Sequence, residues 1–581
     1  MNGHVLLLSG NSPDVGPIAA QTPFFERDWS RAWANFLVQE IGPYTEISPE
    51  ALDFKKLSPE SFLYLPQSSA AHLSGLNGTS FKGFVEAGGT LILEGPAANG
   101  FDFSGVSFSP RRRPLKKISG LGRKNWPAFV NERLPQMPFE TRGWEIERKT
   151  DKAEVLLEME GTPVLFRQAV GKGWVFVLGF DFGLLLTALQ QGVPAREGRR
   201  LEKLFGKIHR VKEPEDLVLK AALLTSEIPW ADFFERFLFK VFTAGRPVPR
   251  WWYFPGVDTG CVISTHDEEA LGSDPRIEAM FAEEKSRGIE GTLFVISDEK
   301  LKQRWQGNGL LRKWGEGGRD IGIHWNRFEK PRAKFRRFKW GMHETPLALQ
   351  KTFLERELGR PISINRNHYL ALGETYGEHF ERLAAEGMRF DSTYGPNQGG
   401  RGYLFGTGYP FYGLTWEGAS SGVLELPFLM QETWGGADLD FLKRLLKESD
   451  ENFHQVVTMN FHPHYTVLQE EGRAAWLGAL SAAKERGQWT PSLGKFFEFF
   501  AARMASPFQS RWEDGRLEIR MNSPKPGLTL CLPRRIEGKG FTKASIDGNP
   551  AQSRGILNFG FEEILIPLPP GTGRVEVHYE R

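Results

Sequence analysis

The sequence predicts a multidomain α/β protein with an N-terminal doubly wound α/β domain, a central β/α domain and a small C-terminal β-sandwich. The chain has 581 residues, and a single hydrophobic core stops growing near about 250–300 residues. Apolar runs of strand length alternate with helical stretches over most of the chain, which is typical of parallel sheets. Toward the C-terminus, short alternating strands are separated by Pro and Gly instead. We therefore expect domains at 1–210, 251–505 and 506–581, with a helical connector at 211–250.

The first domain shows the alternation of strands and helices that indicates a doubly wound, mostly parallel sheet. Its expected strands and helices are His4–Leu8, Phe62–Leu65, Thr90–Leu93 and Trp174–Leu178, and Asp28–Glu40 and Phe81–Ala87. The pair Gly88-Gly89, which ends a helix, and the tight turn Gly171-Lys172-Gly173 together resemble the glutamine-amidotransferase-like fold. An active amidotransferase needs a nucleophilic Cys paired with His, and no Cys precedes Cys261. The resemblance therefore implies a non-catalytic module, which is also the candidate surface for formation of a homo-oligomer.

The connector and the C-terminal domain are predicted from periodicity. Leu217–Ser226 and Trp230–Phe242 have the helical spacing of apolar residues, and the Gly- and Pro-rich segment Gly245–Pro249 marks a boundary. The C-terminal strands are expected at Leu517–Met521, Leu528–Leu532, Ile564–Pro567 and Val575–Tyr579. Such a domain either binds carbohydrate or covers one end of the central domain, and we expect the structural role.

Composition argues against several classes of partner. Lys and Arg number 73 and Asp and Glu number 71, so we expect neither nucleic acid nor an anionic membrane as a partner. The two cysteines, Cys261 and Cys531, provide neither a disulfide framework nor a zinc knuckle. No run approaches the about 20 apolar residues of a membrane span. The apolar run Val5–Leu8 is too short for a signal peptide and no Lys or Arg precedes it, so we expect a cytoplasmic protein.

Polar residues follow the expected strands of the central domain at the places where those strands end. The strand Val262–Ser264 leads into Thr265-His266-Asp267-Glu268, and a helix at Pro275–Arg287 follows. A second strand at Gly291–Ile296 and a further helix lead to Gly317–Asn326. In barrels and open α/β sheets, active sites lie at the carboxyl ends of the strands. The order of these segments therefore predicts a reaction site built on Thr265 to Glu268.

Several segments of the central domain, in this order, resemble the motifs of polysaccharide deacetylases of the NodB-homology type. They are Thr265–Glu268, Thr292–Val295, Gly318–His324, Asn365–Tyr369, Phe390–Gly395, Leu424–Pro427 and Asn460–His464. Each match is weak alone, but together they keep the family's order. The resemblance implies a distorted (β/α) barrel of the deacetylase type and a bound divalent metal, with zinc expected.

The resemblance also implies roles for individual residues. Asp267 is the expected general base, and Arg366 orients it. Glu268 and His324 are the expected metal ligands, and His462 is the expected general acid. In this chemistry the metal polarises an N-acyl carbonyl and lowers the pKa of a water, the base accepts that water's proton, and the acid protonates the leaving amine.

This sequence departs from the family pattern at the metal site. Phe328 stands where the family has its second metal-binding His, and Phe cannot bind a metal. Glu268 in place of Asp moves the ligand oxygen outward by one methylene, and if Asp267 binds the metal instead, the base changes too. His266 stands where the family has Phe, so it is another candidate for the site. The replacement ligand stays open among Asn326, His343, His368 and His464.

The same residues also have simpler explanations. Asp267 and Glu268 could cap the helix that follows, because acidic residues favour helix starts. A single histidine such as His324 on a loop is often only hydrogen-bonded. We favour a real site because the candidate residues all fall at strand ends, in the family's order.

The expected function is metal-dependent removal of an N-acyl group, with acetyl as the expected group, from an amino sugar or a sugar-containing precursor. Tyr394 and Tyr403 belong to a Gly-rich aromatic segment typical of a lid or binding loop, and they are the expected contacts to the carbohydrate substrate. Two alternatives stay open. Phe328 favours a metal-free pseudo-deacetylase that binds carbohydrate or serves as a scaffold, and the lack of a recognisable signal peptide favours hydrolysis of a non-sugar amide.

Overall fold

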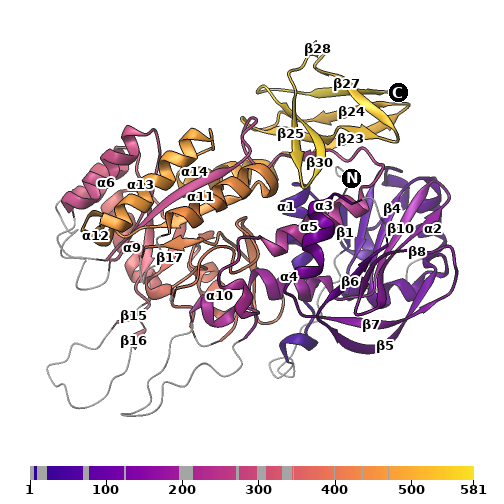
Figure 1. The fold of residues 1–581 in the computed structure, drawn as a ribbon, viewed down its shortest axis with the longest axis horizontal. Helices are drawn as coiled ribbons and strands as arrows, with labels where there is room; N and C mark the ends of the chain where they lie inside the picture. The colour runs from indigo at the N-terminus through magenta and orange to yellow at the C-terminus, as the bar shows by residue number, and fades with distance from the viewer. Residues whose placement is uncertain are drawn as a thin grey trace.

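The computed structural model contains three folded units, which Figure 1 shows with the N-terminal unit at the right, the central unit at the left and the C-terminal unit at the top. The first two units mix helices and strands, and the third is built from strands. Among the described residues, no helix is long and apolar enough to cross a membrane. The structure describes residues 5–8, 23–69, 78–122, 126–194, 213–269, 274–297, 309–329, 343–344, 346–373, 375–397, 399–432, 438–468 and 470–581.

The N-terminal unit contains an eight-stranded mixed sheet. In sheet order the strands are β2 (Thr45–Ile47), β1 (Val5–Leu8), β3 (Phe62–Leu65), β4 (Thr90–Glu94), β10 (Gly173–Leu178), β9 (Thr162–Val170), β8 (Glu154–Met159) and β6 (Ile118–Leu121). The first five are parallel, as expected for a mostly parallel sheet, but β9, β8 and β6 add antiparallel pairs at one side. Only Glu160 and Gly161 join β8 to β9, and only Gly171 and Lys172 join β9 to β10. A parallel pair needs a crossover of a dozen or more residues, so such short turns impose antiparallel pairing.

Both faces of this sheet are covered. Leu6 of β1 enters one apolar core, whereas its neighbours Val5 and Leu7 enter the other. The helices of the unit are α1 (Trp33–Glu40), α2 (Gly78–Ala87), α3 (Ala128–Arg133) and α4 (Phe182–Gln190), and the strands β5 (Val106–Leu115) and β7 (Thr141–Arg148) pair separately. His4, the first residue of the expected N-terminal strand, lies outside the described residues.

The central unit is built on a nine-stranded sheet in which backbone hydrogen bonds also connect strands near its two opposite edges. The strand order is β19 (Phe411–Leu414), β20 (Ser420–Glu425), β18 (Phe390–Asp391), β17 (Ile364–Asn367), β14 (Asp320–Trp325), β13 (Thr292–Val295), β12 (Cys261–Glu268), β22 (Val456–Asn460) and β21 (Met430–Gln431). Every pair is parallel except β19 with β20. Between β20 and β21, the Phe428 N–H donates to the Tyr394 carbonyl and the Leu429 N–H donates to the Thr458 carbonyl. Backbone hydrogen bonds therefore connect the two sides of the sheet, as in a distorted barrel.

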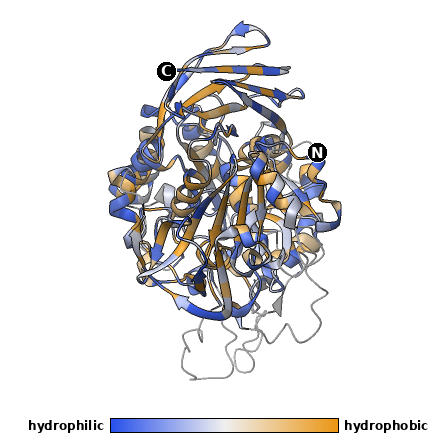
Figure 2. Cartoon of the chain, turned by 90° about the vertical axis from the view of Figure 1, so that its right-hand side faces the viewer, coloured by the Kyte–Doolittle hydropathy of each residue, from blue (hydrophilic) through white to orange (hydrophobic). Residues whose placement is uncertain are grey.

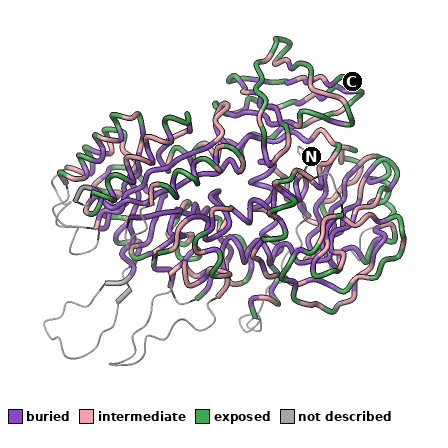
Figure 3. The backbone as a smooth tube through the Cα atoms, in the orientation of Figure 1, coloured by how far each residue is buried: buried purple, intermediate pink, exposed green. Residues whose placement is uncertain are grey.

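Helices surround the strands of the central unit, and Figure 3 shows the strands buried while the outer faces of several helices are exposed. All residues of β12 are buried, because β12 is an interior strand of the sheet, between β13 and β22. The helices are α6 (Asp274–Ser286), α8 (Leu310–Glu316), α9 (Leu347–Leu358), α10 (Glu378–Ala385), α11 (Leu439–Glu448), α12 (Pro463–Leu468), α13 (Glu470–Glu485) and α14 (Leu493–Met504), and β15 (Phe328–Glu329) pairs with β16 (His343–Glu344).

The C-terminal unit consists of two antiparallel sheets that share one apolar core. The first contains β23 (Phe508–Glu513), β24 (Arg516–Met521), β31 (Arg574–Glu580), β27 (Lys539–Ile546), β26 (Arg535–Ile536) and β28 (Asn549–Pro550). The second contains β11 (Arg250–Trp251), β25 (Thr529–Pro533), β30 (Phe561–Pro567) and β29 (Arg554–Asn558). β11 precedes the central unit in the sequence, so the chain contributes a strand to this unit before it enters the central one.

One helix, α5 (Trp230–Phe242), joins the three units. Almost all of its residues are buried, and Figure 2 shows apolar residues concentrated in the interior strands and helices. The Phe233 ring packs against Phe129 at 5.6 Å, Phe453 at 6.4 Å and Phe559 at 4.7 Å between centroids, one from each unit. The other expected connector helix, Leu217–Ser226, is replaced by short 3₁₀ turns at Pro214–Leu217 and Ala221–Leu223.

Candidate metal centre and reaction site

Polar side chains converge where the strands of the central sheet end. The strands concerned are consecutive in the sheet (β17, β14, β13, β12 and β22) and parallel, so their carboxyl ends meet at one edge. The register places His324 opposite Arg366 and Thr265 opposite Asn460. The side chains brought together at this edge are Asp267, Glu269, His324, Arg366, His368, Asn460 and His462.

Alternation along β12 decides which acidic side chains reach this edge. Successive side chains of a strand point to opposite faces, so Asp267 and Glu269 share one face and Glu268 lies on the other. Glu269 Oε1 is 3.3 Å from His324 Nε2, whereas the buried Glu268 is not part of the cluster around His324. The structure therefore places Glu269, rather than Glu268, beside His324.

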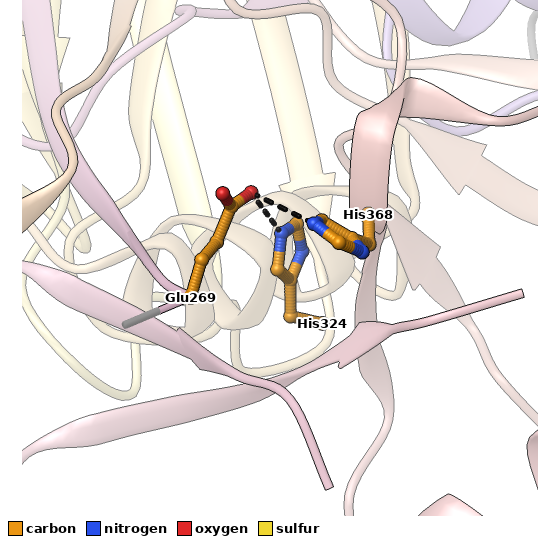
Figure 4. Close-up of side chains that lie close together, drawn as sticks. All are labelled: Glu269, His324 and His368. Atoms are coloured by element: carbon orange, nitrogen blue, oxygen red, sulfur yellow. Dashed lines mark hydrogen bonds and ion pairs between the residues drawn. The ribbon is translucent and has the colours of Figure 1, made fainter. Parts of the chain in front are cut away.

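Glu269, His324 and His368 form the compact group shown in Figure 4. One carboxylate oxygen of Glu269 lies 3.3 Å from Nε2 of both histidines. The Nδ1 atom of His324 is 3.0 Å from the Arg366 carbonyl oxygen, and that of His368 is 2.9 Å from Asn326 Oδ1. The Arg366 carbonyl oxygen only accepts, so His324 Nδ1 donates its hydrogen and its Nε2 presents a lone pair to the group, and a hydrogen bond from His368 Nδ1 to Asn326 Oδ1 would arrange His368 in the same way.

The group has the donor atoms of a metal site, and the distances from its carboxylate to both histidines suit one. Two imidazole nitrogens and a carboxylate oxygen make up one of the ligand sets of catalytic zinc. Bonds of about 2.0–2.1 Å at tetrahedral angles put two ligand atoms about 3.3 Å apart, which is the separation of Glu269 Oε1 from each Nε2. The Nδ1 hydrogen bonds fix both rings, as outer partners do at metal sites. Glu269, His324 and His368 therefore fit a divalent ion.

Asp267 lies beside this group and is held from two sides. Arg366 Nη1 donates to Oδ1 at 3.0 Å, and Asn460 Nδ2 donates to Oδ2 at 2.7 Å. Oδ2 is 3.9 Å from His324 Nε2. Burial by itself raises the pKa of a carboxyl group, but the positive charge of Arg366, aided by that of His462, outweighs burial and lowers the pKa of Asp267. Asp267 is therefore an ionised carboxylate.

His462 stands on the other side of Asp267, with its Nε2 4.0 Å from Oδ2. Glu432 Oε1 accepts a hydrogen bond from its Nδ1 at 2.9 Å. Burial lowers the pKa of an imidazole, but Glu432 and Glu269 outweigh burial and raise the pKa of His462 well above its usual value. His462 therefore carries a proton. Sequence reasoning missed Glu432, although its place directly after β21 is the signal that could have revealed it.

The structure does not place the two expected substrate tyrosines at the site. Tyr394 is 2% exposed and packs against Phe380 and Phe405, and Tyr403 is 0% exposed. The Tyr403 N–H donates to the Ser226 carbonyl, so this loop packs against the connector instead of forming a lid. Glycine allows the close approach: at Gly402, with φ +84°, a Cβ would lie 2.1 Å from the Ser226 oxygen.

The other candidates left open by the sequence have separate partners. Asn326 holds His368, as described above, and His464 Nδ1 is 2.9 Å from Arg276 Nη1. His266 faces away from the cluster and contacts Glu284 at 2.8 Å. The side chains of Phe328 and His343 lie outside the described residues.

Two tyrosines that the sequence did not single out flank the cluster. Tyr369 is 58% exposed and stacks on His368, with 3.9 Å between centroids and 29° between planes. Tyr465 is 37% exposed and meets His462 edge-on at 5.7 Å. Tyr369 and Leu370 have φ values of 55° and 51°, which residues other than Gly rarely adopt. Strained backbone of this kind persists where surrounding structure enforces it, often at functional sites.

Comparisons with known proteins give remote structural likenesses alone. No family model matches the sequence, and no curated protein matches it. A Mycobacterium smegmatis protein, named provisionally as a polysaccharide deacetylase, is similar with 15% identity and a TM-score of 0.30, over 46% of this chain and 98% of that one. Peptidoglycan deacetylase PdaC from Bacillus subtilis is similar with 11% identity and a TM-score of 0.25, over 42% and 94%. A family 4 carbohydrate esterase from Streptomyces lividans is similar with 13% identity and a TM-score of 0.23, over 40% and 93%. Likenesses of this size say nothing about the reaction of this chain.

Proposed function

We propose that the central unit is a metal-dependent hydrolase that removes an N-acyl group, with acetyl as the expected group, from an amino sugar or a sugar-containing precursor. The observation that carries the proposal is the Glu269–His324–His368 group, which lies beside an ionised carboxylate and a protonated imidazole. Glu269, His324 and His368 would hold a divalent ion, which when bound would supply polarisation of an acyl carbonyl and a lowered pKa for a water.

Asp267 and His462 supply the proton transfers in this proposal. Asp267 accepts a proton from the attacking water, and His462 donates one to the leaving nitrogen. Neighbouring groups whose environments push their pKa values apart are natural base and acid partners, and these two are pushed in opposite directions. Arg366 holds the base in place, and Glu432 keeps the acid oriented and charged.

The rim of the site supports a sugar-bearing amide as the substrate. Tyr369 and Tyr465 expose aromatic rings next to His368 and His462. Aromatic rings offer an apolar face with a polar tip, which suits the faces and hydroxyl groups of a pyranose. This favours an amino sugar over an amide without a sugar, and it moves the proposed substrate contacts from Tyr394 and Tyr403 to Tyr369 and Tyr465.

Acetate release from N-acetylated chito-oligosaccharides by the zinc-loaded protein tests the proposal. Asp267→Asn keeps the shape of the side chain and removes the base, so we expect kcat to fall by at least about 100-fold with the zinc content unchanged. Asp440→Asn, the same change at an exposed position of α11, is the matched control and should keep wild-type activity.

Two outcomes would contradict the proposal. Zinc-loaded protein that releases acetate from none of these sugars would remove the assigned reaction. Wild-type kcat in Asp267→Asn would remove Asp267 as the base, even if the protein is an active deacetylase.

A further inference from the structure

A second group of two carboxyls and a histidine lies elsewhere in the central unit. His379 on α10, Asp391 on β18 and Glu425 on β20 are all buried, and one potential ligand atom from each lies within 4.8 Å of the others. Its composition resembles that of the first group, so it could hold either a second metal ion or a proton. The hydrogen bonds around it distinguish the two.

The protonation of His379 follows from the orientation of one amide. Asn367 Oδ1 accepts from Asn365 Nδ2 at 2.9 Å, and its Nδ2 donates to the Ala371 carbonyl. If the Asn367 amide were turned over, its Nδ2 would face Asn365 Nδ2 and its Oδ1 would face the Ala371 carbonyl oxygen. Two donors and two acceptors would then oppose each other, so the orientation of this amide is determined. Asn367 Nδ2 also lies 3.0 Å from His379 Nδ1, which must therefore be the acceptor. The ring hydrogen sits on Nε2 and points to Asp391 Oδ2, so Nε2 has no lone pair for a metal.

The two carboxyl groups divide into one ionised and one protonated member. Asp391 accepts from Asn365 Nδ2 and from Thr393 Oγ1, both at 2.8 Å, and from His379. Glu425 Oε1 accepts from the Tyr394 N–H at 2.9 Å, whereas its Oε2 is buried with no donor among the described residues. Burial raises the pKa of Glu425 well above its usual value, and the charge of Asp391 raises it further. A proton on Glu425 that is donated to Asp391 satisfies both groups.

We infer that His379, Asp391 and Glu425 hold a shared proton and not a metal ion, so that, of the two candidate groups among the described residues, the metal ion is bound at Glu269, His324 and His368.

The group of His379, Asp391 and Glu425 also helps to position Arg366. The importance of that position rests on the proposed function. Asn365 and Asn367, on either side of Arg366, bind the buried group, and the Asn367 N–H donates to Thr393 Oγ1 at 3.0 Å. On the opposite face, Arg366 Nε donates to the Ser392 carbonyl at 2.7 Å and Nη2 donates to Ser392 Oγ at 2.9 Å. Asp391 is thus a positioning residue for the arginine that holds Asp267.

Glu425→Gln tests the inference, because an amide N–H replaces the acid O–H as donor to Asp391 and does not titrate. In the native chain Glu425 keeps its proton above the pKa that it has when unfolded, about 4.3, so the unfolded chain binds fewer protons and stability falls as pH rises. One proton changes the unfolding equilibrium constant by about tenfold per pH unit. We expect Glu425→Gln to lack this contribution and to be more stable than wild type at pH 8, with urea unfolding as the measurement. The other titratable groups that face Glu425, among the described residues, are Asp391, His379 and Tyr394, and the variant retains all three.

Metal analysis by mass spectrometry completes the test. We expect one zinc per chain in wild type and in Glu425→Gln, and none in Glu269→Gln. Two zinc ions in wild type, with one lost in Glu425→Gln, would overturn the inference. Added zinc that stabilises Glu269→Gln as strongly as it stabilises wild type would also overturn it, and this measurement does not need Glu425→Gln to fold. Zinc-free wild type would instead contradict the proposed function, while the comparison of stability at pH 8 would still decide the protonation of Glu425.

Discussion

At the scale of single residues, one step along β12 decides which glutamate belongs to the proposed ligand set. The family resemblance pointed to Glu268, directly after Asp267, yet a strand turns successive side chains to opposite faces. Glu269 lies on the face of Asp267 and reaches His324 and His368. Its longer side chain, compared with Asp, reaches the histidines from a position beyond the end of β12. The period of two along β12 was a signal present in the sequence that could have favoured Glu269.

Changing each of these two glutamates in turn tests this choice. Glu269→Gln should weaken zinc binding by more than about 100-fold, because changes at outer partners of metal ligands already cost about 10–100-fold. Glu268→Gln, the matched control, should leave the zinc affinity at its wild-type value. Zinc titration by calorimetry measures both, and the reverse result would return the ligand role to Glu268.

At the scale of elements, the lengths of the connections explained the direction in which strands pair, which the hydrophobic pattern within a strand does not reveal. The two-residue turns that join β8, β9 and β10 impose antiparallel pairing, although β10 itself was expected from its apolar run. In contrast, the helical periodicity of Trp230–Phe242 predicted α5 with its observed bounds. The Leu217–Ser226 segment has similar periodicity but forms no α-helix there. The Leu224 and Ser226 carbonyls instead accept hydrogen bonds from the loop that contains Tyr403.

The position of α5 predicts that one aromatic residue couples all three units. Phe233→Ala removes a buried ring that meets Phe129, Phe453 and Phe559, so we expect the free energy of unfolding to fall by about 3–5 kcal/mol. Phe541→Ala, at a half-buried position within the C-terminal unit, is the control and should cost less. Urea unfolding followed by fluorescence and circular dichroism checks both, and an unchanged midpoint for Phe233→Ala would contradict the coupling.

At the scale of the whole molecule, a metal that binds only the folded chain stabilises it. Zinc at about 1,000 times its Kd should add about 4 kcal/mol to the free energy of unfolding, because Glu269, His324 and His368 come together only in the folded sheet. Removing zinc with a chelator should reverse this gain in wild type. Glu269→Gln should show no change on chelation, and a chelator effect of equal size in that variant would place the stabilising metal elsewhere.

Several expectations about the whole molecule stay predictions. The resemblance of the N-terminal unit to the glutamine-amidotransferase-like fold, its part in forming a homo-oligomer, and a cytoplasmic location are of this kind. Neither the eight-stranded mixed sheet nor the remote structural likenesses bear on these three points.

The sequence by itself determined which polar residues end the central strands, because hydrophobic patterns and strand ends are local properties of the chain. The resemblance to the deacetylase motifs singled out Asp267, His324, Arg366 and His462, and the structure brings all four to one edge. Only the tertiary structure decided that His368 lies beside Glu269 in the proposed ligand group and that Glu432 holds His462. Those contacts depend on strand register and on the joining of the sheet's two sides, which set distances between residues far apart in the chain. The burial of Tyr394 and Tyr403 was decided in the same way, by packing against a connector that no local pattern relates to their loop.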